Sequence, residues 1–318
     1  MSSAESGTFI GLLQERMDTS SHDKVSDIQL CIDKCEHLSE HPRILSLGAG
    51  TGKVERQIAI DNPNAEVVAI DFNLAMIEEI QKNAVLPEQR HNLSIVRGQI
   101  DRLPFGEETF DIIIASSVIH EVISSRDHGK PGKHTEHLFQ QISRRLHPKG
   151  MFMIRDFVQP DKPNDIVGLR IGAAIKPEDA EPKNFVDRFS QEFKAADFRM
   201  LRYQIELLKQ RRSYGPGSVL YLPYAEAIEI GAHYSWSKRF EAEVKERYAC
   251  FTMLQYQQFI QRNFRAMGIE TIMRARYSYL QPGYPQHING RLDAYSVLTG
   301  KPLHMSPFSG VMAFQRTN

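Results

Sequence analysis

Residues 43–52 read Arg43-Ile44-Leu45-Ser46-Leu47-Gly48-Ala49-Gly50-Thr51-Gly52, an apolar run that ends in three alternating glycines. This pattern predicts a buried strand that leads into a glycine-rich turn and then into a helix. Such a turn presents bare backbone N–H groups at the helix N-terminus, where they can bind the polar part of a nucleotide-like cofactor. The stretch therefore predicts an α/β fold with a cofactor site at residues 48–52.

The spacing of the glycines narrows the type of cofactor. A P-loop needs a glycine where Leu47 stands and a Ser or Thr where Val54 stands. A dinucleotide-binding fingerprint needs a third glycine where Lys53 stands, because close helix–strand packing leaves no room there for a long side chain. The remaining pattern, G-x-G-x-G after hydrophobic residues, resembles motif I of the class I S-adenosylmethionine-dependent methyltransferases.

Further motifs follow in the order and at the spacing of that superfamily. Residues 66–71 predict a second strand that ends in Asp71, about 20 residues past the glycines, where an acidic residue binds ribose hydroxyls. Residues 98–105 match G-x-x-x-x-L-P-F, residues 110–116 begin with F-D and continue as a hydrophobic strand, and residues 146–150 match L-x-P-x-G. This series resembles the ubiquinone/menaquinone-biosynthesis-type branch, most clearly over residues 40–160 and less sharply over 250–318.

The resemblance implies a Rossmann-like, doubly wound seven-stranded sheet with an antiparallel last strand. A capping box at Thr252 opens a helix that ends at Gly268, and the two strands that follow it, 269–277 and 310–315, are expected to pair antiparallel. The predicted units are an N-terminal helical segment (1–40), the cofactor-binding core (41–158), an inserted helical cap on the substrate side (159–250) and a C-terminal completion of the core sheet (251–318).

Composition narrows the class of partner. The chain has 39 Lys and Arg against 39 Asp and Glu, so its net charge is zero, and this balance disfavours a nucleic-acid partner. Three cysteines fit a reducing compartment without structural disulfides. Residues 1–13 lack the pattern of a signal peptide, and no apolar run approaches a membrane span. We therefore expect a soluble, cytoplasmic protein without a membrane partner.

The resemblance assigns S-adenosylmethionine as the cofactor and S-adenosylhomocysteine as its product. Asp71 would accept hydrogen bonds from the ribose hydroxyls. Gln99 stands where the family commonly has an Asp that contacts the adenine amino group, and its amide oxygen can accept the same bond. The residues expected at the cofactor are Gly48, Ala49, Gly50, Gly52, Asp71, Phe72, Gln99, Ile100 and Ser116.

His120 and Glu121 are the candidate catalytic residues, because the resembling enzymes carry a histidine or a small polar residue at this position beside the transferred methyl group. An imidazole there can take a proton from the methyl acceptor, and Glu121 can orient it or bind a substrate cation. The alternative is a helix start in which both are structural. Arg155 and Asp156 end the next strand at the same edge, where they either contact substrate or form a salt bridge.

Other polar groups give weaker predictions. His134 and His137 share a helix face, but their lysine neighbours argue against a metal site, and we expect none. Aromatic residues of the cap, Tyr214, Tyr234 and Trp236, are candidates for a substrate pocket. The expected function is methyl transfer to an O, N or C atom of a small molecule under the cap. The alternatives are an RNA or protein methyltransferase that docks its substrate on the cap, and a sensor that binds the cofactor without turnover.

Overall fold

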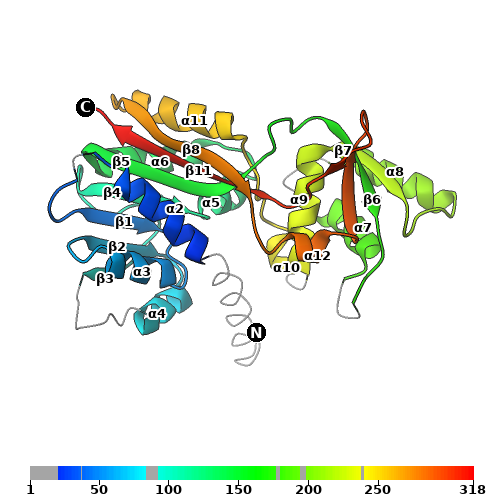
Figure 1. Ribbon diagram of the computed structural model, residues 1–318, viewed down its shortest axis with the longest axis horizontal. Coiled ribbons are helices and arrows are strands. Elements are labelled where there is room, and N and C mark those ends of the chain that lie inside the picture. The colour runs from blue at the N-terminus through cyan, green and yellow to red at the C-terminus, as the bar shows by residue number, and fades with distance from the viewer. Residues whose placement is uncertain (1–20, 37, 84–91, 177–179, 194–197, 238–239) are drawn as a thin grey trace.

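The computed structural model describes residues 21–36, 38–83, 92–176, 180–193, 198–237 and 240–318. These residues form two units that lie side by side (Figure 1). The core unit holds a seven-stranded sheet, and the second unit, made of residues 159–250 and 281–307, holds a four-stranded sheet.

The core sheet has the predicted topology. Its strand order is β3-β2-β1-β4-β5-β11-β8, in which six strands run parallel and β11 runs antiparallel between β5 and β8. The predicted antiparallel pairing of the last two core strands is therefore confirmed. The strands are β1 Arg43–Leu47, β2 Glu66–Asp71, β3 Leu93–Arg97, β4 Phe110–Ser116, β5 Leu146–Val158, β8 Thr271–Leu280 and β11 Phe308–Arg316.

Helices cover both faces of this sheet, which explains why its central strands are apolar almost without interruption. One face packs against α2 Ser21–Asp33, α3 Lys53–Asp61 and α4 Leu74–Asn83. The other packs against α5 Ile119–Arg126, α6 Lys133–Arg145 and α11 Met253–Ala266. The predicted capping box of Thr252 and Gln255 is present at the start of α11. Asn73 caps α4 through a bond from the Ala75 N–H at 3.0 Å.

The second unit corrects the prediction of a purely helical cap. It contains an antiparallel sheet of order β10-β9-β6-β7, built from β6 Ile166–Ile171, β7 Val219–Pro223, β9 Leu292–Ser296 and β10 Pro302–Leu303. Its helices are α7 Pro182–Glu192, α8 Arg199–Gln210, α9 Tyr224–Ser235, α10 Phe240–Glu243 and α12 Pro285–Ile288. Of these, α7 and α8 are amphipathic, with Phe185, Phe189, Leu201 and Ile205 on their buried faces.

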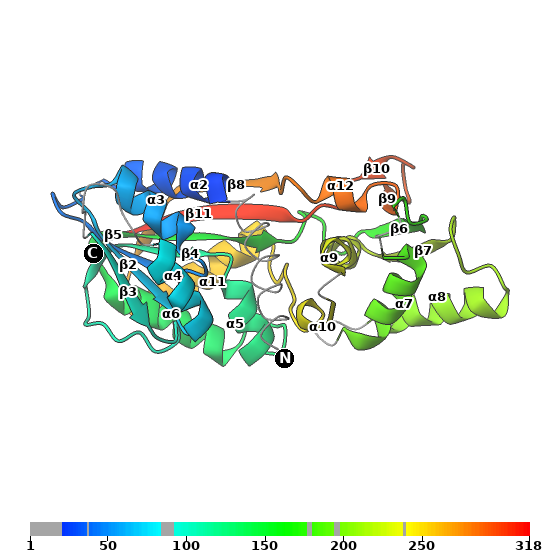
Figure 2. The same cartoon turned by 90° about the horizontal axis from the view of Figure 1, so that it is seen from below.

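Residues 251–318 complete the core sheet through β8 and β11, and they also contribute strands to the second unit. After β8, the chain leaves the core, adds β9 and β10 to the second unit and returns as β11. Four described segments therefore cross between the units. Because β5 leads out toward the second unit and β11 returns from it, the carboxyl ends of the parallel strands face the second unit (Figures 1 and 2).

Candidate functional site

The glycine turn lies at the carboxyl edge of the core sheet, between β1 and α3. Gly48, Gly50 and Gly52 all have left-handed backbone angles, with φ of 66°, 57° and 73°, a region that side chains other than glycine rarely adopt. A Cβ atom on Gly48 would lie 2.5 Å from the Val118 side chain, and one on Gly52 would lie 2.7 Å from Ile80. Glycine is therefore required at these positions.

The prediction of bare backbone N–H groups in this turn needs correction. The Gly48 and Ala49 N–H groups donate to the carbonyl of Ile70 at 2.9 and 3.1 Å, and Gly52 donates to Ala49 at 3.1 Å. The Gly50 N–H donates to the Asp71 carboxylate at 2.9 Å. These bonds fasten the turn to the end of β2, so the glycines supply a sharp, fixed turn and open space rather than free donors.

Asp71 ends β2 beside this turn and is buried. Its two oxygens accept the N–H groups of Gly50 and Asn73, each at 2.9 Å. A carboxylate oxygen has more than one acceptor position, so Asp71 retains capacity for the hydroxyls of a ribose. Next to it, Phe72 is 64% exposed and Leu74 is 51% exposed, which gives the edge an uncovered apolar flank.

Two buried polar atoms at this edge lack a hydrogen-bond partner in the described part of the chain: Ser116 Oγ at the end of β4 and Glu55 Oε2 in the first turn of α3. The other oxygen of Glu55 accepts from Ser46 Oγ at 2.6 Å. Burial raises the pKa of Glu55. Unsatisfied buried polar groups are costly, so they indicate a place for a polar ligand.

Lys24 of α2 lies near these groups, within electrostatic range of Glu55, although no motif of the sequence identifies it. Burial and then the charge of Arg155 lower the pKa of Lys24 to about 8, against the opposing effect of Glu55, Asp156 and Glu121. An amine held beside another cation in this way is suited to binding an anion, such as a carboxylate.

His120 and Asp156 form a buried pair at the same edge. His120 lies in the first turn of α5, and its Nδ1 is 2.6 Å from Asp156 Oδ1, while its backbone N–H donates to Asp156 Oδ2 at 3.0 Å. Phe157 N–H and Tyr256 OH also donate to this carboxylate, at 2.8 and 3.4 Å. Because Asp156 holds Nδ1, the ring presents Nε2 as its second proton-binding atom.

Burial and neighbouring charges shift the pKa values of His120 and of the adjacent Glu121. Burial lowers the pKa of His120, but the charge and hydrogen bond of Asp156, with smaller effects of Glu121 and Glu246, raise it to about 9. Glu121 has a solvent-exposed side chain. The protein around its carboxyl nevertheless raises its pKa to about 7, partly opposed by His120.

Arg155 forms a salt bridge at the sheet edge, with Asp27 rather than with the neighbouring Asp156. It is fully buried and donates from Nε to Asp27 Oδ2 at 3.0 Å and from Nη2 to the Tyr279 hydroxyl at 2.9 Å. Its backbone carbonyl and its guanidinium also bind Ser117, at 2.7 and 3.3 Å. Arg155 therefore fastens α2 and β8 to the sheet edge instead of facing a substrate.

The aromatic candidates of the second unit divide into two kinds. Tyr214 and Tyr234 are core residues whose hydroxyls donate to the carbonyls of Lys183 and Ala180 at 3.2 and 2.6 Å. The structure thus gives them a packing role. Trp236 is half-buried and donates from its indole to the Tyr284 hydroxyl at 3.0 Å.

The remaining predicted residues lie as follows. Gln99 is exposed, and Ile100 packs half-buried against the core. The loop before α6 is organised by Asp127, which accepts the N–H groups of Gly132, His134 and Thr135. Within the described ranges, no group of three or more His, Cys, Asp or Glu side chains could hold a metal ion.

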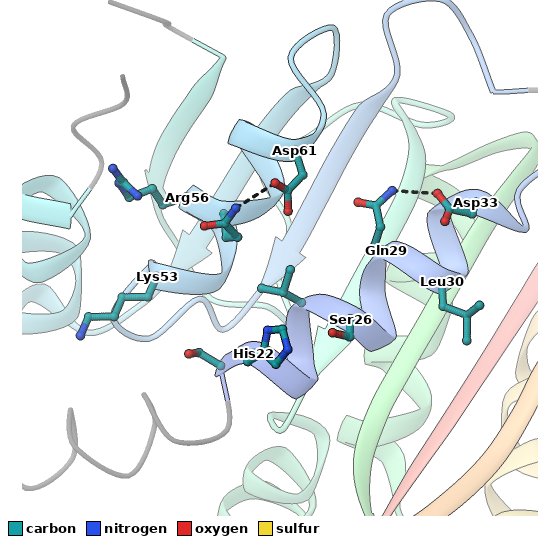
Figure 3. Close-up of a pocket in the computed structure, with 11 residues that line it drawn as sticks. His22, Ser26, Gln29, Leu30, Asp33, Lys53, Arg56 and Asp61 are labelled. Carbon is teal, nitrogen blue, oxygen red and sulfur yellow. Dashed lines mark hydrogen bonds between the residues drawn. The ribbon is translucent and has the colours of Figure 1, made fainter. Parts of the chain in front are cut away.

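Figure 3 shows a groove on the outer side of α2 and α3. None of the predicted site residues lines it, so it is distinct from the glycine turn. Polar side chains in its lining bond to one another, for instance Gln29 to Asp33 and Gln57 to Asp61, each at 2.8 Å. The lining residues are Ser21, His22, Val25, Ser26, Gln29, Leu30, Asp33, Lys53, Arg56, Gln57 and Asp61.

Comparison with known proteins decides the family. A family model described as "Methyltransferase domain" matches residues 38–201, which is more than half of the chain. The chain belongs to the class I S-adenosylmethionine-dependent methyltransferase family. The match contains the glycine turn, Asp71 and the His120–Asp156 pair, so the features described above lie inside the methyltransferase domain.

Curated relatives agree on the class and differ in substrate. A malonyl-[acyl-carrier protein] O-methyltransferase of Legionella pneumophila is 32% identical over 28% of this chain and 30% of its own. A ubiquinone/menaquinone biosynthesis C-methyltransferase of Syntrophotalea carbinolica is 30% identical over 38% of this chain and 46% of its own. A Homo sapiens tRNA N(3)-cytidine methyltransferase is 29% identical over 43% of this chain and 35% of its own. The chain thus spans less than half the length of these relatives.

The cofactor that this family uses fits the residues present. The glycine turn leaves space that a side chain would fill, Asp71 keeps acceptor capacity, and Ser116 and Glu55 offer unsatisfied polar atoms. No helix in the described ranges is long and apolar enough to cross a bilayer.

Proposed function

We propose that this protein transfers a methyl group from S-adenosylmethionine to a small-molecule acceptor bound between the core and the second unit. The observation that carries the proposal is the His120–Asp156 pair, buried at the same sheet edge as the glycine turn and Asp71. S-adenosylmethionine supplies an electrophilic methyl group, so the protein has to orient the two reactants and manage one proton.

Different residues would bind the different parts of the cofactor. The glycine turn and Asp71 would hold the ribose and neighbouring part of the cofactor, and Phe72 would cover the adenine side. Lys24 and Ser116 would bind the charged amino-acid end, with Ser116 adding a hydrogen bond. Such charge-assisted bonds contribute about 1.5–3 kcal/mol each when buried. Together they would hold the cofactor at the carboxyl ends of β1, β2 and β4.

His120 would act as the general base. As the acceptor atom forms its bond to the methyl group and the sulfur–methyl bond breaks, leaving S-adenosylhomocysteine, the acceptor's proton would pass to Nε2 of a neutral His120 ring. Asp156 would stabilise the resulting imidazolium through Nδ1. The raised pKa of His120 means that its ring is largely protonated at neutral pH in the free protein. A cation bound nearby favours the neutral ring, so binding of the positively charged cofactor prepares the base.

The zero net charge and the pairing of basic residues on α8 favour a small molecule over a nucleic acid. The basic residues of α8, which a nucleic acid would need, are partly neutralised: Lys209 pairs with Asp187 and Glu206 at 2.9 and 3.0 Å. Arg202 donates to the Ser190 carbonyl at 2.6 Å. The match to a tRNA methyltransferase keeps RNA as the second candidate acceptor.

A label-transfer assay tests the proposal. The purified protein is mixed with methyl-labelled S-adenosylmethionine and with cell extract separated into small-molecule, RNA and protein fractions. Label in the small-molecule fraction, lost in His120→Gln, is the expected result. Label in RNA or protein would refute the small-molecule acceptor, and cofactor binding without label in any fraction would favour a sensor.

A further inference from the structure

A histidine that the proposed reaction does not use lies at the centre of the second unit. His233, on α9, is 1% exposed. Its Nδ1 lies 2.8 Å from the carbonyl oxygen of Glu229, one turn earlier on the same helix. Its Nε2 lies 3.0 Å from the carbonyl oxygens of both Glu243 and Glu246.

These contacts determine the protonation of the ring. Carbonyl oxygens only accept hydrogen bonds, so both ring nitrogens have to donate. A neutral imidazole has one N–H, whereas an imidazolium has two. The positive charge has a partner, because a carboxylate oxygen of Glu229 lies 3.7 Å from Nδ1. The geometry therefore requires a buried imidazolium.

The groups that contact this ring come from three segments of the second unit. Glu229 comes from α9 itself, and the segment 243–249 contributes the two carbonyls and the Tyr248 ring, which stacks on His233 with centroids 4.4 Å apart. From α7 and its C-cap, the rings of Phe189 and Phe193 close the apolar side, at centroid distances of 4.9 and 5.3 Å. The carboxylate of Glu243 accepts the Tyr248 hydroxyl, so it too lies beside the stack.

Glu229 holds the same segment from the other side. Its two carboxylate oxygens accept the backbone N–H groups of Tyr248 and Ala249 at 2.7 and 3.3 Å. The pair thus fixes segment 243–249 by its carbonyls through His233 and by its amides through Glu229. Such double attachment leaves the segment one conformation relative to α9.

The far side of this segment forms a wall of the active site. The Tyr248 ring stacks on Phe157, with centroids 5.0 Å apart, and meets the His120 ring edge-on at 5.7 Å. Glu246 acts electrostatically on both His120 and Glu121. A shift of segment 243–249 would therefore move an aromatic wall and a negative charge away from the catalytic histidine.

We propose that His233 is a positioning residue: as a buried imidazolium paired with Glu229, it holds segment 243–249 so that Tyr248 and Glu246 stand beside His120. In this way the second unit sets the environment of the base in the core. The consequence for turnover rests on the proposed function, whereas the protonation state and the anchoring do not.

Nuclear magnetic resonance of the ring nitrogens tests the protonation state directly. In the intact protein at neutral pH, His233 should show two N–H groups, assigned in the wild type through their proximity to the stacked Tyr248 ring. A ring with one protonated and one bare nitrogen would overturn the proposal. This measurement needs only the wild-type protein for its result, so a variant that folds poorly does not prevent it.

Hydrogen exchange tests the anchoring. In His233→Gln, the amides of Tyr248 and Ala249 should exchange at least about tenfold faster, with no change in β1. His304→Gln, an exposed histidine of the same unit, is the matched control. Unchanged exchange of these amides in a folded His233→Gln protein would overturn the proposal.

The catalytic readout separates positioning from general stability. His233→Gln should lower kcat/KM for the acceptor by about tenfold or more while the Kd for S-adenosylmethionine changes less than about twofold. The resonances of the His120 ring should shift as well. A loss explained by the folded fraction alone, with His120 unmoved, would overturn the positioning role. If the wild-type protein transfers no methyl group, the proposed function fails while the two preceding measurements still decide on the anchor.

Discussion

Replacing Asp156 by Asn should remove a pH dependence of stability that the wild-type protein owes to His120. Asp156 is the main reason that the pKa of His120 rises, against the effect of burial, from 6.5 to about 9. A shift of that size corresponds to about 3 kcal/mol, because one pKa unit is worth about 1.4 kcal/mol. His120 is 4% exposed, so solvent screening reduces this value little.

The sign follows from the protonated form. A histidine with a raised pKa in the folded state stabilises the protein fully below its unfolded pKa, and this stabilisation is lost as pH rises through the folded pKa. The wild-type free energy of unfolding should therefore fall by about 3 kcal/mol from His120 between about pH 6.5 and pH 9. In Asp156→Asn this contribution should disappear, because burial alone keeps the ring neutral.

Urea unfolding at the two ends of that range measures the effect. Other groups titrate there too, so the quantity of interest is the change in Asp156→Asn relative to Asp161→Asn, which removes an exposed loop carboxylate. A direct titration of the His120 ring should give an apparent pKa well above 6.5 in the wild type and at or below it in Asp156→Asn. Titration of the wild-type ring near 6.5, or an equal pH dependence in both variants, would refute the reasoning.

Three further substitutions test the cofactor site. Asp71→Ala should weaken S-adenosylmethionine binding by about 1–3 kcal/mol in calorimetry, as expected for loss of a buried charged acceptor, and wild-type affinity would exclude its role. Gly48→Ala should cost about 1–3 kcal/mol of folding stability or abolish cofactor binding. The added methyl group would sit on a residue with left-handed backbone angles and would clash with the Val118 side chain. Gly215→Ala, where a Cβ atom meets nothing within 4 Å, is its control and should change stability by less than about 0.5 kcal/mol. Lys24→Gln should raise the cofactor Kd about tenfold or more, whereas the exposed Lys34→Gln should leave it unchanged; equal affinities in the two would contradict the assignment of Lys24.

The core fold could be predicted because the motifs that specify it lie in short, continuous stretches of sequence. The strand, glycine turn and helix at residues 43–61 follow one another in sequence, and so do β2 with Asp71 and α4 with its Asn73 cap. The four-stranded sheet could not be predicted in this way. β6 and β9 pair although more than 100 residues separate them, and each is a short run that reads as loop when taken alone. Nothing in either segment identifies its partner.

The site shows the same division between local and long-range information. His120 and Asp156 were both named from sequence, but their pairing depends on how β4 and β5 align. Ser116 lies opposite Arg155 in that register, so the residue after Arg155 faces the first turn of α5, where His120 stands. Arg155 thereby points to the other side, toward Asp27. A one-residue change in register would exchange these roles, and the register is disturbed by an irregularity between Phe110 and Ile112 that sequence periodicity does not reveal. His120 was therefore recognisable from sequence as a candidate base, whereas the carboxylate that it pairs with was fixed only by the packing of two strands.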